Sequence, residues 1–302
     1  MQFPARVTLI EVGPRDGWQA EPIPISTPDK IALIDALSAS GLPAIQVTSF
    51  VRQDRVPQMA EAEAVCAGIA RRAGVEYSGL ALNLRGVERA AAARLDKIDI
   101  SSSASDTHSR LNTGMGAHEA AREVGTMAAR AHALGLRVRG GVQCAFGCAF
   151  EGAIDAQRVL DLVRELVGYG VDEVLLADST GMANPAQISR MLEAALPLLG
   201  DTPLVLHLHD TRGMGLANVL AALAHGVARF DTAFGGLGGC PFIPGATGNI
   251  ATEDTLHMLA EMGIVTGVRL SDVAGVSLRM AALLRRALPG KLYRLGSHSE
   301  AG

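Results

Sequence analysis

The sequence predicts an α/β protein, a single (β/α)₈ barrel with a small helical appendage toward its C-terminal end. Three observations predict this fold. Short β-type runs alternate eight times with amphipathic Ala/Leu-rich runs over about 250 residues, which is the pattern of such a barrel. Glycines follow the helical runs, where a left-handed cap favours them. Unusual polar residues follow the β-type runs. A doubly wound parallel sheet is the main alternative, and eight units favour the barrel over it.

The elements follow in order along the chain. Strands are expected at residues 7–11, 44–48, 76–81, 97–101, 137–143, 173–177, 204–209 and 229–232. Helices are expected between them at residues 27–40, 55–73, 84–94, 117–134, 156–169, 185–199 and 215–225. Ser26 and Asn184 offer N-caps, each followed by a proline in the first helical turn. Residues 235–302, a glycine-rich loop and at least two helices, are expected to form a lid and an appendage of one catalytic domain spanning 1–302.

Composition excludes several classes of protein. The 302 residues are 48% hydrophobic and 19% charged, and the net charge of −4 gives no case for binding nucleic acid or an anionic membrane. Four cysteines form no disulfide framework in a chain of this length. The first residues lack the basic and apolar regions of a signal peptide, and no apolar run approaches the ~20 residues of a membrane span. We expect a soluble, reduced, cytoplasmic protein that acts on a small molecule.

The most informative motif is a pair of histidines, His207 and His209, at the end of an apolar run that reads as a buried strand. Residues two apart on a strand point to the same face, so the two imidazoles lie side by side. Imidazole is a common ligand of divalent metal ions. The pair therefore indicates a metal site. The alternative is two hydrogen-bonded histidines at a strand end.

Other unusual polar residues share the same rim of the barrel, where active sites of this fold lie. Asp16 follows the first strand and could add a carboxylate to the histidine pair, although Asp-Gly is also a common turn. Arg15 beside it could stabilise a carboxylate or a developing enolate oxygen, or form a salt bridge at the barrel mouth. Asp178 could bind substrate or hydrogen-bond its own loop. Gln143 and Cys144 are expected to pack, and Trp18 could line the mouth or belong to the core.

A glycine-rich loop follows the eighth strand, with glycines at 235, 236, 238, 239, 245 and 248. It lacks the Lys-Ser/Thr of a phosphate-binding loop and the strand–turn–helix setting of a dinucleotide fingerprint. We expect a flexible lid that carries the thiol of Cys240. The alternative is a surface thiol without a role. Asn249 stands before an expected helix, so it could be a ligand or an N-cap.

Taken together, these segments resemble the 3-hydroxy-3-methylglutaryl-CoA lyase family of the DRE-TIM metallolyases, which also include isopropylmalate and homocitrate synthases. The matching stretches lie at residues 11–17, 48–51, 56–59, 138–140, 207–211, 236–241 and 245–249, and the resemblance covers about residues 5 to 292. The Cys-bearing glycine loop is the most specific stretch, because the synthases lack it.

The resemblance implies particular roles. It makes Asp16, His207, His209 and Asn249 the ligands of a divalent metal, with Mg²⁺ or Mn²⁺ expected. It makes Arg15 the catalytic arginine and Cys240 the catalytic thiol of the lid loop. We further expect Asp16 to take part in catalysis, with Asp16 or His207 as the base, and Arg15, Gln46, Arg139 and Asp178 to bind substrate. It further implies an acyl-CoA substrate, a homo-oligomer (dimer or tetramer) and a place in leucine degradation.

The implied reaction is a metal-assisted retro-Claisen cleavage of 3-hydroxy-3-methylglutaryl-CoA to acetoacetate and acetyl-CoA. The sequence departs from the family at Gln46, where Glu is usual, at Trp18 and at Ala20. Gln46 and Trp18 motivate one alternative, a lyase for citramalyl-CoA or a longer branched 3-hydroxyglutaryl-CoA. The change from Glu to Gln motivates another, an inactive metal- or acyl-CoA-binding homologue. A Claisen-type acyltransferase is a third alternative, and the Cys-bearing loop counts against it.

Overall fold

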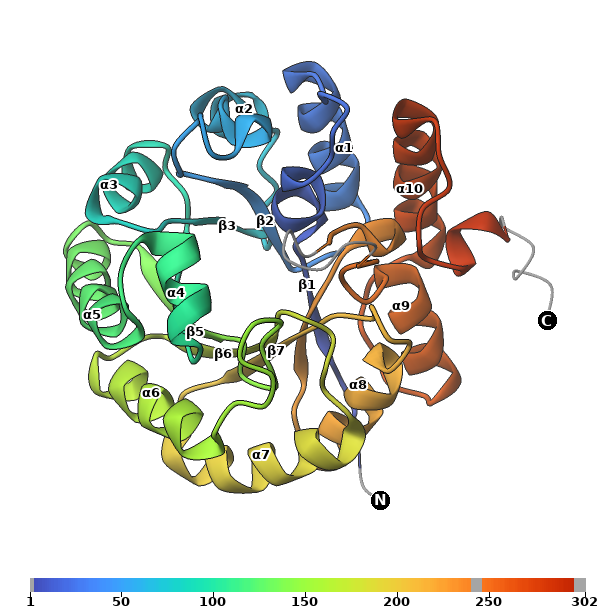
Figure 1. Cartoon of the computed structure of the whole chain (residues 1–302). Coiled ribbons are helices and arrows are strands. Elements are labelled where there is room, and N and C mark those ends of the chain that lie inside the picture. The colour runs from blue at the N-terminus through green and yellow to red at the C-terminus, as the bar shows by residue number, and fades with distance from the viewer. Residues whose placement is uncertain (1–2, 240–245, 296–302) are drawn as a thin grey trace.

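The computed structural model describes residues 3–239 and 246–295, which form a closed barrel of parallel strands inside a ring of helices (Figure 1). The strands pair in the order of the sequence, and β8 pairs with β1 to close the barrel. The predicted fold is confirmed. The strands are β1 (Thr8–Glu11), β2 (Ala44–Ser49), β3 (Glu76–Leu80), β4 (Lys97–Ser103), β5 (Arg137–Gln143), β6 (Glu173–Asp178), β7 (Leu204–Leu208) and β8 (Arg229–Thr232).

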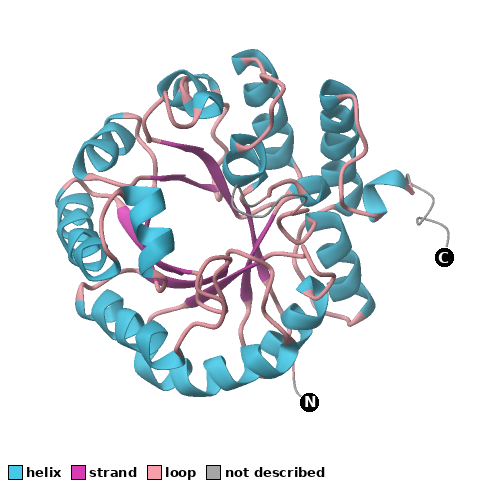
Figure 2. Ribbon diagram, in the orientation of Figure 1, coloured by secondary structure: helices cyan, strands magenta, loops and turns pink. Residues whose placement is uncertain are grey.

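The helices form the outer layer, seen in cyan around the magenta strands in Figure 2. They are α1 (Thr27–Ala39), α2 (Ala62–Gly68), α3 (Leu84–Ala92), α4 (Asp106–Thr113), α5 (Ala117–Ala133), α6 (Ala156–Gly168), α7 (Pro185–Leu199), α8 (Gly215–Ala224), α9 (Thr252–Glu261) and α10 (Leu270–Leu284), with short turns η1 (Gly13–Gly17), η2 (Pro57–Met59), η3 (Phe234–Gly236) and η4 (Leu292–Arg294). The caps behave as predicted. Ser26 accepts from the Asp29 amide at 3.2 Å, and Asn184 accepts from the Gln187 amide at 3.0 Å.

The helix predicted at residues 55–73 is wrong in extent. The structure has only the turn η2 and the short helix α2 there. The segment after α2 is held by bonds to other elements: the Ala70 amide donates to Asp35 at 2.8 Å, and the Arg71 guanidinium donates to the carbonyl of Ala93 at 2.9 Å. These tertiary hydrogen bonds replace the helical ones. Their contribution outweighs the local helix propensity of the segment.

Helix α4 is a finding that the sequence did not predict. It follows β4 and lies inside the ring of outer helices, over the strands (Figure 1). Ser105 caps it by accepting from the His108 amide at 3.1 Å, and Gly114 ends it in the left-handed conformation. Because α4 is short and polar, it carries none of the apolar periodicity from which helices are predicted.

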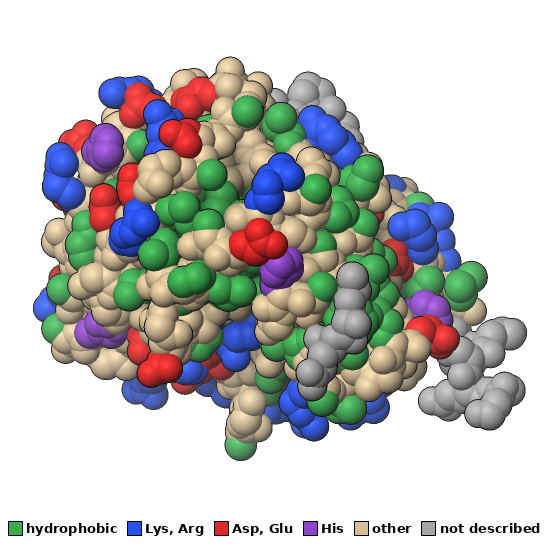
Figure 3. All heavy atoms as spheres, turned by 90° about the horizontal axis from the view of Figure 1, so that it is seen from below, with side chains coloured by type: hydrophobic (Ala, Val, Ile, Leu, Met, Phe, Trp, Pro, Cys, Tyr) green, Lys and Arg blue, Asp and Glu red, His purple; other side chains and the backbone are tan. Residues whose placement is uncertain are grey.

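The residues that follow β8 form the last part of the outer ring of helices and also extend beyond it. Helix α9 packs beside η3, and α10 contacts both α9 and α1 (Figure 1). Part of the segment expected as an appendage therefore belongs to the outer layer of the barrel. No helix of the described residues is long and apolar enough to cross a membrane. Figure 3 shows charged side chains of both signs interspersed on the face that it draws.

The layer between the strands and the outer helices is apolar, and the interior of the barrel is partly polar. Apolar side chains of strands and helices form one continuous core between the two layers. Arg139 of β5, in contrast, bonds to Asp99 of β4 and to Asp231 of β8. Since β8 is not a neighbour of β5 in the sheet, this side chain crosses the interior of the barrel. A buried layer of charged groups thus lies beneath the mouth.

Candidate active site

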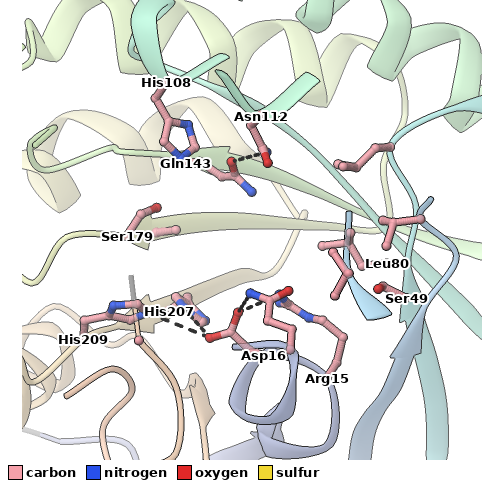
Figure 4. A pocket seen from close by; sticks show the side chains of 16 residues that line it. Arg15, Asp16, Ser49, Leu80, His108, Asn112, Gln143, Ser179, His207 and His209 are labelled. Atoms are coloured by element: carbon pink, nitrogen blue, oxygen red, sulfur yellow. Dashed lines mark hydrogen bonds and ion pairs between the residues drawn. The ribbon is translucent and has the colours of Figure 1, made fainter. Parts of the chain in front are cut away.

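A cavity of about 180 Å³ opens at the carboxyl ends of the strands, where active sites of this fold lie. Figure 4 shows Arg15, Asp16, His207 and His209 on one side of it and His108, Asn112 and Gln143 on the other. Apolar side chains complete its wall. The lining residues are Arg15, Asp16, Gln19, Ser49, Val51, Val56, Leu80, Leu82, His108, Asn112, Gln143, Ala177, Ser179, His207, His209 and Gly239.

Arg15 and Asp16 are presented by η1, the tight turn that follows β1 directly. Gly13 starts this turn because a side chain there would lie 2.6 Å from the ring of Phe234. Arg15 Nη1 donates to Asp16 Oδ1 at 2.6 Å, and its Nε donates to the side-chain oxygen of Gln46. The guanidinium is thus held by two hydrogen bonds, one to Asp16 and one to Gln46, and neither of them uses Nη2.

His207 and His209 share one face, as their spacing predicts. Their Nε2 atoms lie 3.0 Å apart. His207 Nδ1 lies 3.1 Å from Asp231 Oδ2, so a neutral His207 donates from Nδ1 and keeps the lone pair of Nε2 for a ligand. If the two Nε2 atoms shared a hydrogen bond, His209 would donate it and its Nδ1 would be an acceptor. That buried Nδ1 has no partner among the described residues.

These atoms fit a metal ion. Asp16 Oδ2 lies 3.9 Å from His207 Nε2 and 4.0 Å from His209 Nε2. A point equidistant from the three atoms lies about 2.1 Å from each, the length of a bond from a transition metal or Mg²⁺ to nitrogen or oxygen. The three residues form the one candidate metal cluster in the described part of the chain.

Asn249 reaches this cluster because its segment pairs with the end of β7. His209 and Asn249 form an antiparallel bridge, and the Asp210 amide donates to the carbonyl of Gly248 at 2.7 Å. Asn249 Nδ2 donates to Asp16 Oδ2 at 2.7 Å and to the Leu237 carbonyl at 3.0 Å. Its Oδ1 is buried without a partner among the described residues, as a ligand oxygen would be. The N-cap alternative is excluded, since α9 is preceded by Ala251.

The arms of the glycine loop are closely packed. A side chain at Gly248 would lie 2.4 Å from the carbonyl carbon of Gly238, so glycine is needed where the arms touch. Cys240 and the rest of 240–245 lie outside the described residues, and the expected role of this thiol stays a prediction.

Electrostatics favour a charged Asp16 carboxylate and a neutral His209 imidazole. Burial raises the pKa of Asp16, but Arg15 and the two histidines outweigh it and lower that pKa to about 2. Burial, together with the neighbouring His207, lowers the pKa of His209 to about 3. Asp16 is therefore ionised and His209 neutral at neutral pH, which are the states in which both groups bind metal.

Three residues expected to bind substrate lie beneath the cavity and do not line it. Arg139 is 1% exposed and bonds to Asp99 and Asp231, each at 2.6 Å. Gln46 is fully buried under Arg15. Asp178 accepts from the amides of Met182 at 2.9 Å and Ala183 at 3.1 Å, so it holds its own loop. In this structure the three side chains support the site from below, and their expected role in binding substrate stays a prediction.

Other residues of the wall escaped the sequence analysis. His108 and Asn112 reach the cavity from α4, and Asn112 Nδ2 donates to Gln143 Oε1 at 3.4 Å. Gln143 therefore lies at the site and not in the core, contrary to expectation. Its place at the end of β5 was the signal available. Trp18 is fully buried, edge-on to Phe234 with the ring centroids 6.2 Å apart, so it belongs to the core.

Comparison with known proteins agrees with this geometry. The model of a protein family described as HMGL-like matches residues 6–278. The chain belongs to the HMGL-like family. It is 40% identical over 291 residues to hydroxymethylglutaryl-CoA lyase YngG of Bacillus subtilis, covering 96% of this chain and 97% of the relative.

Two further relatives are informative. A 3-hydroxy-3-isohexenylglutaryl-CoA/hydroxymethylglutaryl-CoA lyase of Pseudomonas aeruginosa is 40% identical over 287 residues, covering 95% of this chain and 96% of the relative. The structure of an HMG-CoA lyase from Acinetobacter baumannii in complex with coenzyme A and 3-methylmalate superimposes with a TM-score of 0.94 at 39% identity, covering 100% of this chain and 99% of that one.

Proposed function

We propose that this protein cleaves 3-hydroxy-3-methylglutaryl-CoA to acetoacetate and acetyl-CoA. The observation that carries the proposal is the placement of Arg15 next to Asp16, His207 and His209 on one side of the cavity. A retro-Claisen cleavage needs negative charge to be stabilised on two oxygens, the alkoxide of the 3-hydroxyl and the enolate of the thioester. The site offers one set of groups for each of these oxygens. The lyase relatives support the same substrate class.

Asp16, His207, His209 and Asn249 would hold the divalent cation. When bound, that cation stabilises negative charge on the substrate hydroxyl oxygen and lowers its pKa. A donor set of one carboxylate, one amide oxygen and two imidazoles suits Mg²⁺ or Mn²⁺. Asp231 orients His207 by accepting from its Nδ1. Asp16 is the neighbouring group able to accept the hydroxyl proton, since His207 in this arrangement already carries a proton on Nδ1 and gives its Nε2 lone pair to the cation.

Arg15 would stabilise the enolate oxygen of the leaving acetyl-CoA. Its Nε and Nη1 are occupied by Gln46 and Asp16, which fixes the plane of the guanidinium before substrate arrives. A preorganised cation acts on developing charge without a cost in reorganisation. The side chain is largely buried at the cavity floor, so its charge is weakly screened by water.

A longer branched substrate is the second candidate, since the relative from Pseudomonas aeruginosa is named for both substrates. The cavity wall carries Val51, Val56, Leu80 and Leu82, which suit a methyl group or an alkenyl chain. Neither Trp18 nor Gln46 lines the cavity, so their departures from the family do not reshape the wall.

We further propose a cytoplasmic homo-oligomer that acts in leucine degradation, as expected from the resemblance.

A steady-state panel tests the proposal. The purified protein is assayed with 3-hydroxy-3-methylglutaryl-CoA, its isohexenyl analogue and citramalyl-CoA, each in EDTA and in Mg²⁺ or Mn²⁺. We expect acetoacetate and acetyl-CoA in equal amounts from the first substrate, and only with metal. A larger kcat/KM for another thioester would reassign the substrate. Condensation in the reverse sense only, or no turnover of any thioester, would contradict a lyase.

A further inference from the structure

A chain of buried polar side chains runs from Arg15 into the barrel. Gln46 of β2 accepts from Arg15 Nε through its Oε1 and donates through its Nε2 to Asp99 Oδ2 of β4. Gln46 is 0% exposed and Asp99 is 5% exposed. The amide thus lies between a guanidinium and a carboxylate, with one of its two polar atoms on each.

Asp99 of β4 accepts hydrogen bonds from side chains of three other strands, β2, β3 and β5. Its Oδ1 accepts from Arg139 Nε at 2.6 Å, and its Oδ2 accepts from Ser78 Oγ at 3.0 Å as well as from Gln46. It is not among the residues that line the cavity. The carboxylate is therefore fully engaged within the barrel and cannot contact substrate.

The carboxylate decides which way the amide of Gln46 points. Turning that amide over would set its oxygen against Asp99 and its NH₂ group against the Nε–H of Arg15, so both contacts would become repulsive. A neutral amide at position 99 could instead donate or accept, and both orientations of Gln46 would then be possible. The charge on Asp99 therefore keeps an acceptor facing Arg15.

We propose that Asp99 is a positioning residue for Arg15, and that Gln46 relays its negative charge as an oriented dipole. This arrangement supplies, one residue deeper, the negative charge that Gln46 itself does not carry. It orients the guanidinium without a second carboxylate in contact with it, so more of its positive charge is available to an enolate oxygen. The inference rests on the proposed function of Arg15 and deepens it.

Four variants test the relay: Asp99→Asn, Gln46→Glu, the double variant with both changes, and Glu173→Gln as a control. Glu173 is also a buried carboxylate, bonded to Lys97 at 2.7 Å, but its ion pairs are with Lys97 and Arg229, outside the chain of Arg15, Gln46 and Asp99. Metal content and Tm are measured for each, so that loss of folding is separated from loss of positioning.

For Asp99→Asn we expect kcat to fall by about 10²-fold, the scale of a misplaced catalytic group, with KM changed by less than about three-fold. In Gln46→Glu two carboxylates meet and must share a proton, so its kcat falls and the acid limb of its pH profile moves to higher pH. In the double variant the new amide at 99 donates to the new carboxylate at 46, and kcat recovers to within about ten-fold of wild type. Glu173→Gln is expected to have a lower Tm. Its kcat, measured at a temperature below that Tm, is expected to equal that of wild type.

A wild-type kcat in Asp99→Asn, or a double variant no faster than Asp99→Asn, overturns the relay. A second readout does not need turnover. The Nε–H resonance of Arg15, assigned by its loss in Arg15→Lys, is followed in ¹⁵N-arginine-labelled protein. We expect it to shift in Asp99→Asn and to be unmoved in Glu173→Gln; an unmoved resonance in Asp99→Asn contradicts the relay. A wild-type protein that cleaves no thioester refutes the proposed function, and the resonance still decides the relay.

Discussion

Asp231 contacts His207, one of the proposed metal ligands, and is not itself in the proposed ligand set; Asp231→Asn therefore measures how much it supports metal binding. Its Oδ2 accepts from His207 Nδ1 at 3.1 Å and its Oδ1 accepts from Arg139 Nη1 at 2.6 Å. The side chain is 1% exposed, and Arg139 and His207 hold its pKa low against the effect of burial. Both carboxylate oxygens thus face donors.

Asparagine has one acceptor oxygen and one NH₂ group, so one of these two donors must face another donor. If the NH₂ group faces His207, the imidazole has to carry its proton on Nε2 and lose its lone pair for the metal. If it faces Arg139, a buried cation loses one of its two carboxylates. Loss of such a partner of a ligating histidine costs about 10–100-fold in metal affinity, or roughly 1.4–2.7 kcal/mol.

The assay is a titration of metal-stripped protein with Mn²⁺ in competition with a chelator of known affinity. Asp172→Asn is the control, because Asp172 also makes a carboxylate–imidazole contact, with Nε2 of His132 at 3.0 Å near the surface. We expect an increase in Kd of about 10–100-fold for Asp231→Asn and none for Asp172→Asn. A Kd for Asp231→Asn within about two-fold of wild type would refute the reasoning, provided that the Tm shows a folded protein.

Three further predictions concern Asn249, Glu11 and Cys240. Asn249→Ala removes the Oδ1 atom that has no partner among the described residues, and it should raise the metal Kd by about ten-fold or more in the same titration; unchanged affinity would remove Asn249 from the ligand set. Burial raises the pKa of Glu11 to about 8, so the unfolded state loses this proton at lower pH than the folded one, and the free energy of unfolding should fall as pH rises from about 4.5 to 8. Glu11→Gln should flatten that slope in urea unfolding at pH 5 and pH 8 with EDTA present, and parallel curves for the two proteins would contradict it. Cys240→Ser should lose about 10²–10⁴-fold in kcat with metal content unchanged, and near-normal kcat or lost metal would disprove a proton-transfer role.

The strands could be read from the sequence because each one carries its own apolar signal. The strands predicted at 137–143 and 229–232 match β5 and β8 at both ends. The histidine pair and Asp16 could be placed together for a related reason. Parallel strands bring their carboxyl ends to one rim, so residues that follow strands are neighbours whatever their separation in the chain.

Contacts across the barrel interior could not be read in that way. Asp178 ends β6 at the same rim as the ligands, and Arg139 lies in the first half of β5. Only the fold shows that Asp178 turns toward its own loop and that Arg139 turns across the barrel interior. Asp99 gave no signal, since one aspartate in a strand reads as solvent-facing until its partners Gln46 and Arg139 are known. Helix α4 escaped because a short polar helix is specified by its caps and its packing over the barrel and not by periodicity.

The central claim is that Asp16, His207 and His209 hold one divalent ion on which cleavage depends, and one paired measurement tests it directly. Wild type and His207→Ala are stripped with EDTA, titrated with Mn²⁺, and followed for bound metal and for acetoacetate release at each point. We expect one ion per chain in wild type, with activity rising in step with occupancy, and loss of both in a folded His207→Ala variant. Full activity in metal-free wild type, or an unchanged ion in His207→Ala, would contradict it.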